Sequence, residues 1–241
     1  MQSSKSIYSW LVLGPIYNDL HQTARPEDHH PDDGHPMAKA IIENIDKNDT
    51  FKPLELTASV EKAPKPGDIT TYGNGMIYNQ KDYQWRVLSF TGGTWGNLVN
   101  IENNIHLSLG PSSRDSKDPL SFFGKHHALV FLLVYIYSPY ARETQLCVRS
   151  DDSIRVWFNG AEIEPLRYAG ERDIGYGPNR HPEETCADIS LRKDCNILLA
   201  AVAETHVEWG FSARLMNARC LRVSPTPSEH RFDCREDLPS T

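Results

Sequence analysis

The pair Asp151-Asp152 is the stretch of this sequence whose residue types point most directly to chemistry. Two adjacent carboxylates beside Ser153 offer the hard oxygen ligands that calcium binds in numbers of about six to eight. Turn capping is the alternative interpretation, because short acidic side chains at the end of a strand also bond to neighbouring backbone amides. Asp151 and Asp152 are therefore the candidate metal ligands, with calcium as the expected ion and no organic cofactor expected.

A second candidate is the pair His206 and Glu208, which flank Val207. Alternate side chains of a strand face the same way, so the imidazole and the carboxylate would share one face near a strand end. A partly buried histidine beside a carboxylate can act as a general acid or base, which makes these two the candidate catalytic residues. The sequence contains no Gly-x-Ser-x-Gly elbow, phosphate-binding glycine loop, His-Glu-x-x-His motif or cysteine nucleophile signature, and several common enzyme classes are thereby excluded.

Four aromatic side chains lie in or beside turn-rich segments and are candidate ligand contacts: Tyr72, Trp85, Trp95 and Tyr176. Exposed rings can stack on the apolar faces of sugars or line a pocket for a hydrophobic molecule, and packing in the core is the alternative. His126 is a further candidate ligand-binding residue. It begins a strand beside His127, where only one of two consecutive side chains can face a pocket. A surface or edge histidine is the alternative there.

These candidates depend on a unit of strands and turns from Cys147 to Gly160. Apolar residues alternate with other residues from Ile154 to Phe158, which predicts a half-buried strand. Asn159-Gly160 follows, and both residues tolerate the positive φ of a tight hairpin turn. The unit therefore predicts a strand, an acidic turn, a second strand, an Asn-Gly turn and a third strand.

The order Ser-Asp-Asp, then Val156-Trp157, then Asn159-Gly160 resembles the central hairpin of two related kinds of β-sandwich module. These are the anthrax-protective-antigen-type domain and the jelly-roll carbohydrate-binding modules. Residues 10–15 and Trp209-Gly210-Phe211 are similar to the first and closing strands of such modules. The resemblance implies a jelly-roll sandwich. It also implies calcium at Asp151-Asp152, because a similar acidic pair in the lectin domains of yeast flocculation adhesins holds the calcium that binds sugar hydroxyls.

The remaining patterns predict an all-β chain, an antiparallel β-sandwich (jelly roll) with one short helix and long irregular loops. Residues 129–137 are apolar on both faces, which is typical of a central strand covered on both sides. A helix is expected to start at Asp33 or His35, and an irregular strand is expected over residues 51–60. The predicted organisation is one domain over residues 1–224, with a loop and short helix inserted at 17–50, and a polar tail over residues 225–241.

Composition and charge limit the partners. The net charge is −7 and no basic stripe is present, so neither nucleic acid nor an anionic membrane surface is an expected partner. The longest apolar run, residues 128–136, is far shorter than the roughly twenty residues of a membrane-spanning helix. The N-terminus shows no pattern of a secretory signal, so the expected location is the cytoplasm, with secretion as the open alternative.

The sequence has five cysteines, an odd number, and no Cys-x-x-Cys motif. Buried free thiols in a reducing compartment are therefore the expectation, and a bridge between Cys220 and Cys234 is the alternative.

Three functional hypotheses follow. The first is a non-catalytic ligand-binding sandwich of carbohydrate-binding type, assisted by calcium, with a glycan or small molecule as its ligand. The second is a stand-alone jelly-roll enzyme of natural-product biosynthesis. Such a cyclase or pericyclic-reaction catalyst needs a shaped pocket and one or two acids rather than an elaborate motif. The third is an assembly module that pairs through an edge strand, of which a homodimer is one form.

Overall fold

The structure is a computed structural model that describes residues 3–17, 40–48, 50–73, 80–89, 99–100, 128–170, 184–204 and 210–227. Every strand pairing among them is antiparallel, and the described chain is an all-β sandwich, as predicted. The strands are β1 Ser4–Ser6, β2 Ser9–Tyr17, β3 Ile69–Tyr72, β4 Lys81–Gln84, β5 Arg86–Ser89, β6 Val99–Asn100, β7 Ala128–Ser138, β8 Arg142–Asp151, β9 Ser153–Phe158, β10 Ala161–Glu162, β11 Thr185–Leu191, β12 Asp194–Glu204, β13 Gly210–Met216 and β14 Arg222–Ser224.

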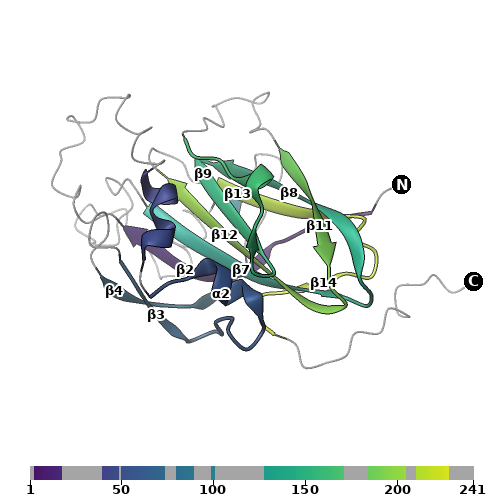
Figure 1. Ribbon diagram of the computed structural model, residues 1–241, viewed down its shortest axis with the longest axis horizontal. Helices are drawn as coiled ribbons and strands as arrows, with labels where there is room; N and C mark the ends of the chain where they lie inside the picture. Colours follow the sequence, from purple (N-terminus) through teal and green to yellow (C-terminus); the bar gives the residue numbers. More distant parts are fainter. Residues whose placement is uncertain are drawn as a thin grey trace, which may run out of the picture.

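Two sheets form the sandwich (Figure 1). The five-stranded sheet has the order β1-β13-β8-β11, and β6 also pairs with β13. The seven-stranded sheet has the order β10-β9-β12-β7-β2-β5, and β14 also pairs with β7. A separate ribbon of β3 and β4 accompanies them. The acidic turn between β8 and β9 carries the chain from one large sheet to the other.

The first core fills the space between the two large sheets. On β7 it takes Val130, Leu132 and Val134, whose side chains all point to one face because successive strand residues alternate. From the five-stranded sheet it takes alternate residues of β8, β11 and β13, among them Leu146 and Ile189. The outward-facing residues between them are left available for other contacts.

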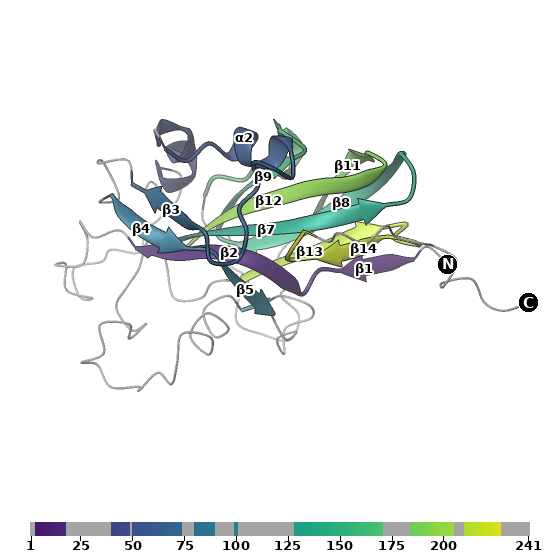
Figure 2. The same ribbon diagram turned by 90° about the horizontal axis from the view of Figure 1, so that it is seen from below.

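A second core covers the opposite face of the seven-stranded sheet. Leu129, Phe131 and Leu133 of β7 point to this side, and residues 40–73 pack over them. Figure 2 shows α2, Pro53–Ala58, lying over β9 and β12 on this side. The prediction that residues 129–137 form a central strand covered on both sides is confirmed.

The Asn-Gly hairpin predicted after β9 is also confirmed. Asn159 and Gly160 have φ values of 51° and 85°, in the left-handed region that a tight hairpin turn requires. The Asn159 side chain donates to Asn196 Oδ1 at 2.8 Å and accepts from the Ile197 N–H at 3.0 Å. The Gly160 N–H donates to Thr57 Oγ1 at 3.1 Å. The turn is thereby held between β12 and α2.

The irregular strand expected over residues 51–60 is wrong, because Pro53–Ala58 form the helix α2. Proline fits the first helical positions, where its missing N–H leaves no hydrogen bond unmade. Thr57 Oγ1 donates to Pro53 O at 3.0 Å and so satisfies a carbonyl within the helix. The helix expected from residue 33 or 35 lies in part outside the described residues. Within them, residues 40–43 are helical and Ile45–Lys47 form a 3-10 turn, labelled η3.

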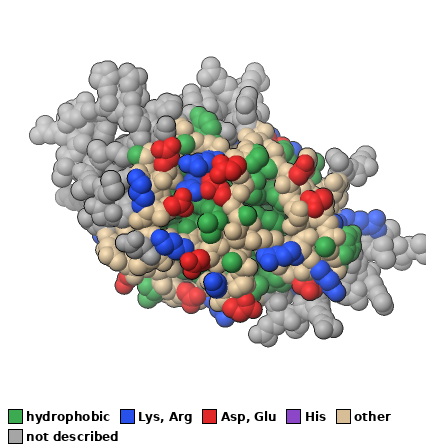
Figure 3. All heavy atoms as spheres, in the orientation of Figure 1, with side chains coloured by type: hydrophobic (Ala, Val, Ile, Leu, Met, Phe, Trp, Pro, Cys, Tyr) green, Lys and Arg blue, Asp and Glu red, His purple; other side chains and the backbone are tan. Residues whose placement is uncertain are grey.

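The surface of the described residues is mixed in charge. Figure 3 shows acidic and basic side chains interspersed over the face drawn there. Among the described residues, no helix has the length and apolar character needed to cross a membrane.

Candidate functional site

Serine side chains on either side of the acidic turn bond to backbone groups. Asp152 is 3% exposed, and its carbonyl oxygen accepts a hydrogen bond from Ser150 Oγ at 2.9 Å. The Ser153 hydroxyl donates to Gly170 O and accepts from the Gly170 N–H, both at 2.8 Å. The Ser150 bond is a local turn contact, whereas the Ser153 bonds tie the turn to a segment seventeen residues along the chain. The side chain of Asp151 lies outside the described residues.

Calcium at Asp151-Asp152 stays a prediction. The ion takes about six to eight oxygen ligands. The one group of three or more potential metal-ligating His, Cys, Asp or Glu side chains found among the described residues is elsewhere, at Cys147, Glu184 and Cys186. Of the two predicted ligands, Asp152 is the one whose side chain the structure describes.

The acidic turn lies at one end of the sandwich, where several chain segments begin or end. Asp151 pairs with Gly210, the first residue of β13, and Ser153 pairs with Ala203 near the end of β12. Gly170 lies beside Ser153 through the bonds given above. Residues 204 and 210, which flank residues 205–209, therefore lie at this end of the sandwich, and so does Gly170, which precedes residues 171–183.

Five of the predicted site residues lie outside the described residues, and their roles stay predictions. They are Trp95, His126, Tyr176, His206 and Glu208. The described residues that flank the last three lie at the same end of the sandwich as the acidic turn.

Tyr72 and Trp85 are both fully buried rather than exposed on loops, and they belong to the second core. Trp85 Nε1 donates to Thr70 Oγ1 at 2.8 Å. The Tyr72 ring lies 5.5 Å from Phe51 and 5.3 Å from Phe131, centroid to centroid. Burial raises the pKa of Tyr72 well above its usual value. For Tyr72 and Trp85 the structure favours core packing, the alternative to ligand contact, because their large rings fill the layer between β7 and residues 40–73.

The described residues form a polar groove on the outer face of the five-stranded sheet, the face turned away from the first core. Arg149 of β8 pairs with Ser212 of β13, and Arg214 pairs with both Ser6 of β1 and Cys147 of β8. The groove has a volume of about 220 Å³. We call it the Arg-Glu groove, and it is lined by Ser4, Ser6, Ile7, Tyr8, Arg149, Glu184, Ser212, Ala213 and Arg214.

Charge is concentrated on one wall of the Arg-Glu groove. Arg214 Nε donates to Glu184 Oε1 at 2.7 Å, and its Nη2 pairs with Oε2, which gives a bidentate contact. Arg149 Nε lies 3.7 Å from Glu184 Oε1. The bond from Arg214 holds the pKa of Glu184 below its usual value and raises the pKa of Arg214. Tyr8, which is 43% exposed, also lines the groove.

A disulfide joins Cys147 of β8 to Cys186 of β11, which face each other across the strand pair. The expectation of buried free thiols is therefore wrong for this pair, while Cys195 is free. Cys220 is disulfide-bonded as well, and the Cys234 end of the predicted bridge lies outside the described residues. The cytoplasmic location stays a prediction. The disulfide is more typical of an oxidising compartment, where such bonds mainly persist.

The groove residues were not singled out by the sequence. Arg149 and Cys147 alternate with buried residues of β8, a pattern that places them on the outer face of a strand. Their neighbours Arg214 and Glu184 come from strands and loops far along the chain, and only the register of three strands brings them together.

No protein-family model matches the chain, and no curated protein matches it. Among solved structures, the chain is similar to the PA14 sugar-binding domain from an RTX adhesin, with 15% identity over 57% of this chain and 74% of that one and a TM-score of 0.36. It is also similar to the PA14 domain of the MpAFP antifreeze protein, with 13% identity over 71% of this chain and 84% of that one and a TM-score of 0.35.

A further similarity is to a β-glucosidase from Kluyveromyces marxianus, with 11% identity and a TM-score of 0.32. It covers 68% of this chain but only 18% of the enzyme's chain.

Proposed function

We propose that this chain is a non-catalytic β-sandwich that binds a glycan, and that it does so in the Arg-Glu groove. The observation that carries the proposal is the chemical make-up of the groove: serine hydroxyls, a bidentate arginine–carboxylate pair and an exposed tyrosine in one concave site. Sites for small molecules typically combine a concave shape with a few convergent polar groups that fix the orientation of the ligand.

Each component suits a sugar. A hydroxyl group both donates and accepts, so Ser6 and Ser212 can bond to sugar hydroxyls in either sense. Arginine and glutamate supply donors and acceptors at fixed spacing, which matches pairs of neighbouring hydroxyls. The Tyr8 ring offers an apolar surface on which the C–H face of a sugar ring can stack.

The charge of the groove favours an acidic sugar. Arg149 and Arg214 bring two guanidinium groups, against the single carboxylate of Glu184. Both guanidinium groups contact Glu184, and we expect the excess of one positive charge over the single carboxylate to attract a ligand carboxylate or sulfate. We therefore expect uronic-acid or sulfated glycans to bind more tightly than neutral ones, and the difference to shrink at high salt.

The test is a glycan array probed with the purified chain, followed by calorimetry on the best glycan. Tyr8→Ala is expected to weaken binding about tenfold, the loss of about 1.4 kcal/mol that one stacking contact supplies. Tyr140→Ala is the matched control, because Tyr140 is 51% exposed but does not line the groove. An array without any bound glycan, or equal losses in the two variants, would contradict the proposal.

Calcium enters this proposal through the acidic turn, on the sequence resemblance alone. The same binding measurements are to be made with calcium and with a chelator. Binding in the Arg-Glu groove is expected to persist in chelator, because the groove uses no metal. Binding that needs calcium and disappears in Asp152→Asn would instead place the glycan at the acidic turn, and would refute the groove as its site.

A further inference from the structure

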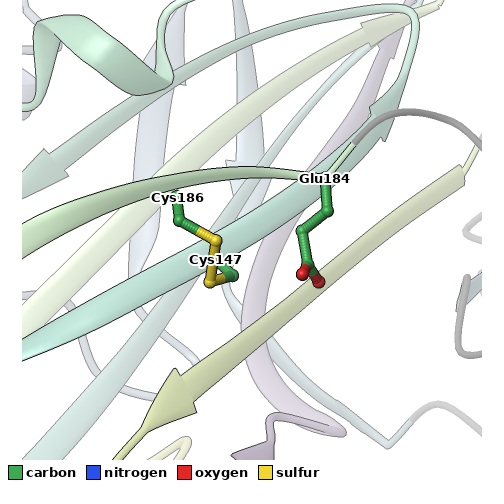
Figure 4. A group of neighbouring side chains, drawn as sticks. All are labelled: Cys147, Glu184 and Cys186. Carbon is green, nitrogen blue, oxygen red and sulfur yellow. A yellow bond between two sulfur atoms is a disulfide. The ribbon is translucent and has the colours of Figure 1, made fainter.

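The outer face of the five-stranded sheet holds a group of three potential metal ligands next to the Arg-Glu groove. Cys147 and Cys186 are directly opposite each other on β8 and β11. Glu184 precedes Cys186 by two residues and so shares its face. The two sulfur atoms and a Glu184 carboxylate oxygen all lie within 4.8 Å of one another, and Figure 4 shows the Glu184 side chain beside the disulfide that joins Cys147 to Cys186.

The disulfide keeps the sulfur atoms from acting as thiolate ligands, and its position makes it open to reduction. Cys186 is exposed at the surface of β11, while Cys147 is 2% exposed. A phosphine reductant would cleave the bond with one water molecule, giving two thiols and one phosphine oxide. The Arg149 and Arg214 side chains lie on the same face and contact Glu184.

We propose that reduction of the Cys147–Cys186 disulfide turns this group into a binding site for a thiophilic divalent cation, of which zinc is the type. The two thiolates and one Glu184 oxygen supply three of the four ligands of a tetrahedral site, and water takes the fourth position. Two thiols lose their protons when the cation binds, so binding releases two protons for each metal ion. The inference does not depend on glycan binding.

The donor set selects among cations. Thiolate ligands favour zinc and cobalt over calcium and magnesium, which take oxygen ligands. Glu184 must give up part of its bidentate contact with Arg214 to reach the metal. The positive charge of the cation replaces that of the guanidinium at the carboxylate, so we expect the exchange to be tolerated.

The experiment uses the full chain, reduced with a phosphine that is then removed without oxygen, and titrated with cobalt and then zinc. The reduced chain is expected to bind one cobalt with the near-ultraviolet charge-transfer absorption of thiolate ligation, and zinc is expected to displace it. The oxidised chain is expected to give no such absorption. Glu184→Gln is expected to weaken zinc binding by at least about tenfold, the lower end of the effect of losing even an outer partner of a metal site.

The matched control is the double variant Cys147→Ser and Cys186→Ser. It keeps Cys195 and Cys220, whose thiols are also present after reduction. The same cobalt absorption in this variant would overturn the proposal, as would a reduced chain that binds no cobalt. Circular dichroism before and after reduction tests the fold, and a chain that unfolds on reduction would also overturn it.

Discussion

Arg155 of β9 is the buried charge whose removal tests the energetics of this fold most sharply. It is 3% exposed, and its Nε donates to Glu162 Oε1 at 2.8 Å while Nη2 pairs with the other oxygen. Its Nη2 also lies 2.8 Å from Asp46 Oδ2, and its Nη1 donates to Ile42 O at 3.2 Å. The guanidinium carbon lies 4.8 Å from the centroid of the Trp157 ring. One side chain thus ties β9 and β10 to the segment that covers the second core.

Arg155→Met is expected to lower the free energy of unfolding by about 3–5 kcal/mol. Removing one partner of a buried ion pair leaves the other charge without compensation, and this is the usual size of that effect. The abandoned charge is Glu162, whose side chain is 14% exposed. Loss of the cation–π contact with Trp157 falls within this range, since such contacts contribute about 0.5–2 kcal/mol. Arg155→Lys keeps the charge but not the bidentate contact, so we expect an intermediate loss.

Arg167→Ala is the matched control, because Arg167 faces the same carboxylate from the surface. Its side chain is 33% exposed, and its Nη1 lies 3.9 Å from Glu162 Oε1. An exposed pair of this kind contributes about 0–1 kcal/mol. Glu162→Gln added to Arg155→Met is expected to recover part of the loss, because the uncompensated carboxylate is then gone.

The assay is equilibrium unfolding in urea. With a slope of about 2 kcal/mol per molar urea, the expected loss moves the midpoint of Arg155→Met down by about 1.5–2.5 M, and that of Arg167→Ala by less than about 0.5 M. A loss below about 1 kcal/mol in Arg155→Met at an unchanged slope would refute the reasoning. It would mean that the free-energy cost of desolvating the Arg155 guanidinium nearly cancels the favourable energy of its ion pairs.

Two further predictions concern titrating groups. Burial raises the pKa of Tyr135, whose hydroxyl donates to Pro64 O at 3.0 Å, so its stabilising effect is complete below the unfolded pKa of about 10 and is lost as the pH rises above it. Between about pH 10 and about pH 12, we expect the free energy of unfolding of Tyr135→Phe to fall less steeply with pH than that of the parent chain. Urea unfolding at several pH values measures this, and an identical pH dependence of the two chains would count against it. Burial likewise raises the pKa of Cys195, so iodoacetamide at neutral pH is expected to modify it more slowly than an exposed peptide cysteine, and mass spectrometry showing equal rates would contradict that.

The strands that could be predicted are those whose signal is local. The strand from Ile154 to Phe158 and the Asn159-Gly160 turn need no distant partner to be predicted, and both are present. The prediction that this strand is half-buried is wrong, because β9 is buried on both faces: Val156 packs in the first core and Trp157 in the second. The two-sided apolar run of β7 is equally direct, since both of its faces are buried. Residues 51–60 were misassigned because so short a helix shows little periodicity, and α2 is stabilised by its contacts with β9 and β12.

The Arg-Glu groove could not be predicted, because it depends on register. A shift of one residue between β8 and β13 would move Arg149 and Arg214 to different relative positions, and nothing in the local sequence fixes that pairing. Likewise, Cys147 and Cys186 can be paired only once β8 and β11 are known to be neighbours. For Tyr72 and Trp85, proximity to turns was a poor guide, because the chain folds back over the sheet and encloses both rings.

The two-sided burial of β7 also restricts the register in which this strand can pair with its neighbours. Its residues are divided by parity: Val130 and Leu132 serve one core, and Phe131 and Leu133 serve the other. A slip by a single position would send the phenyl ring into the space shaped for valine, and leave a void where that ring had been. A register shift would therefore disrupt the packing of both cores at once. Neither core would gain contacts that compensate for the loss, so the register of β7 is fixed from both faces.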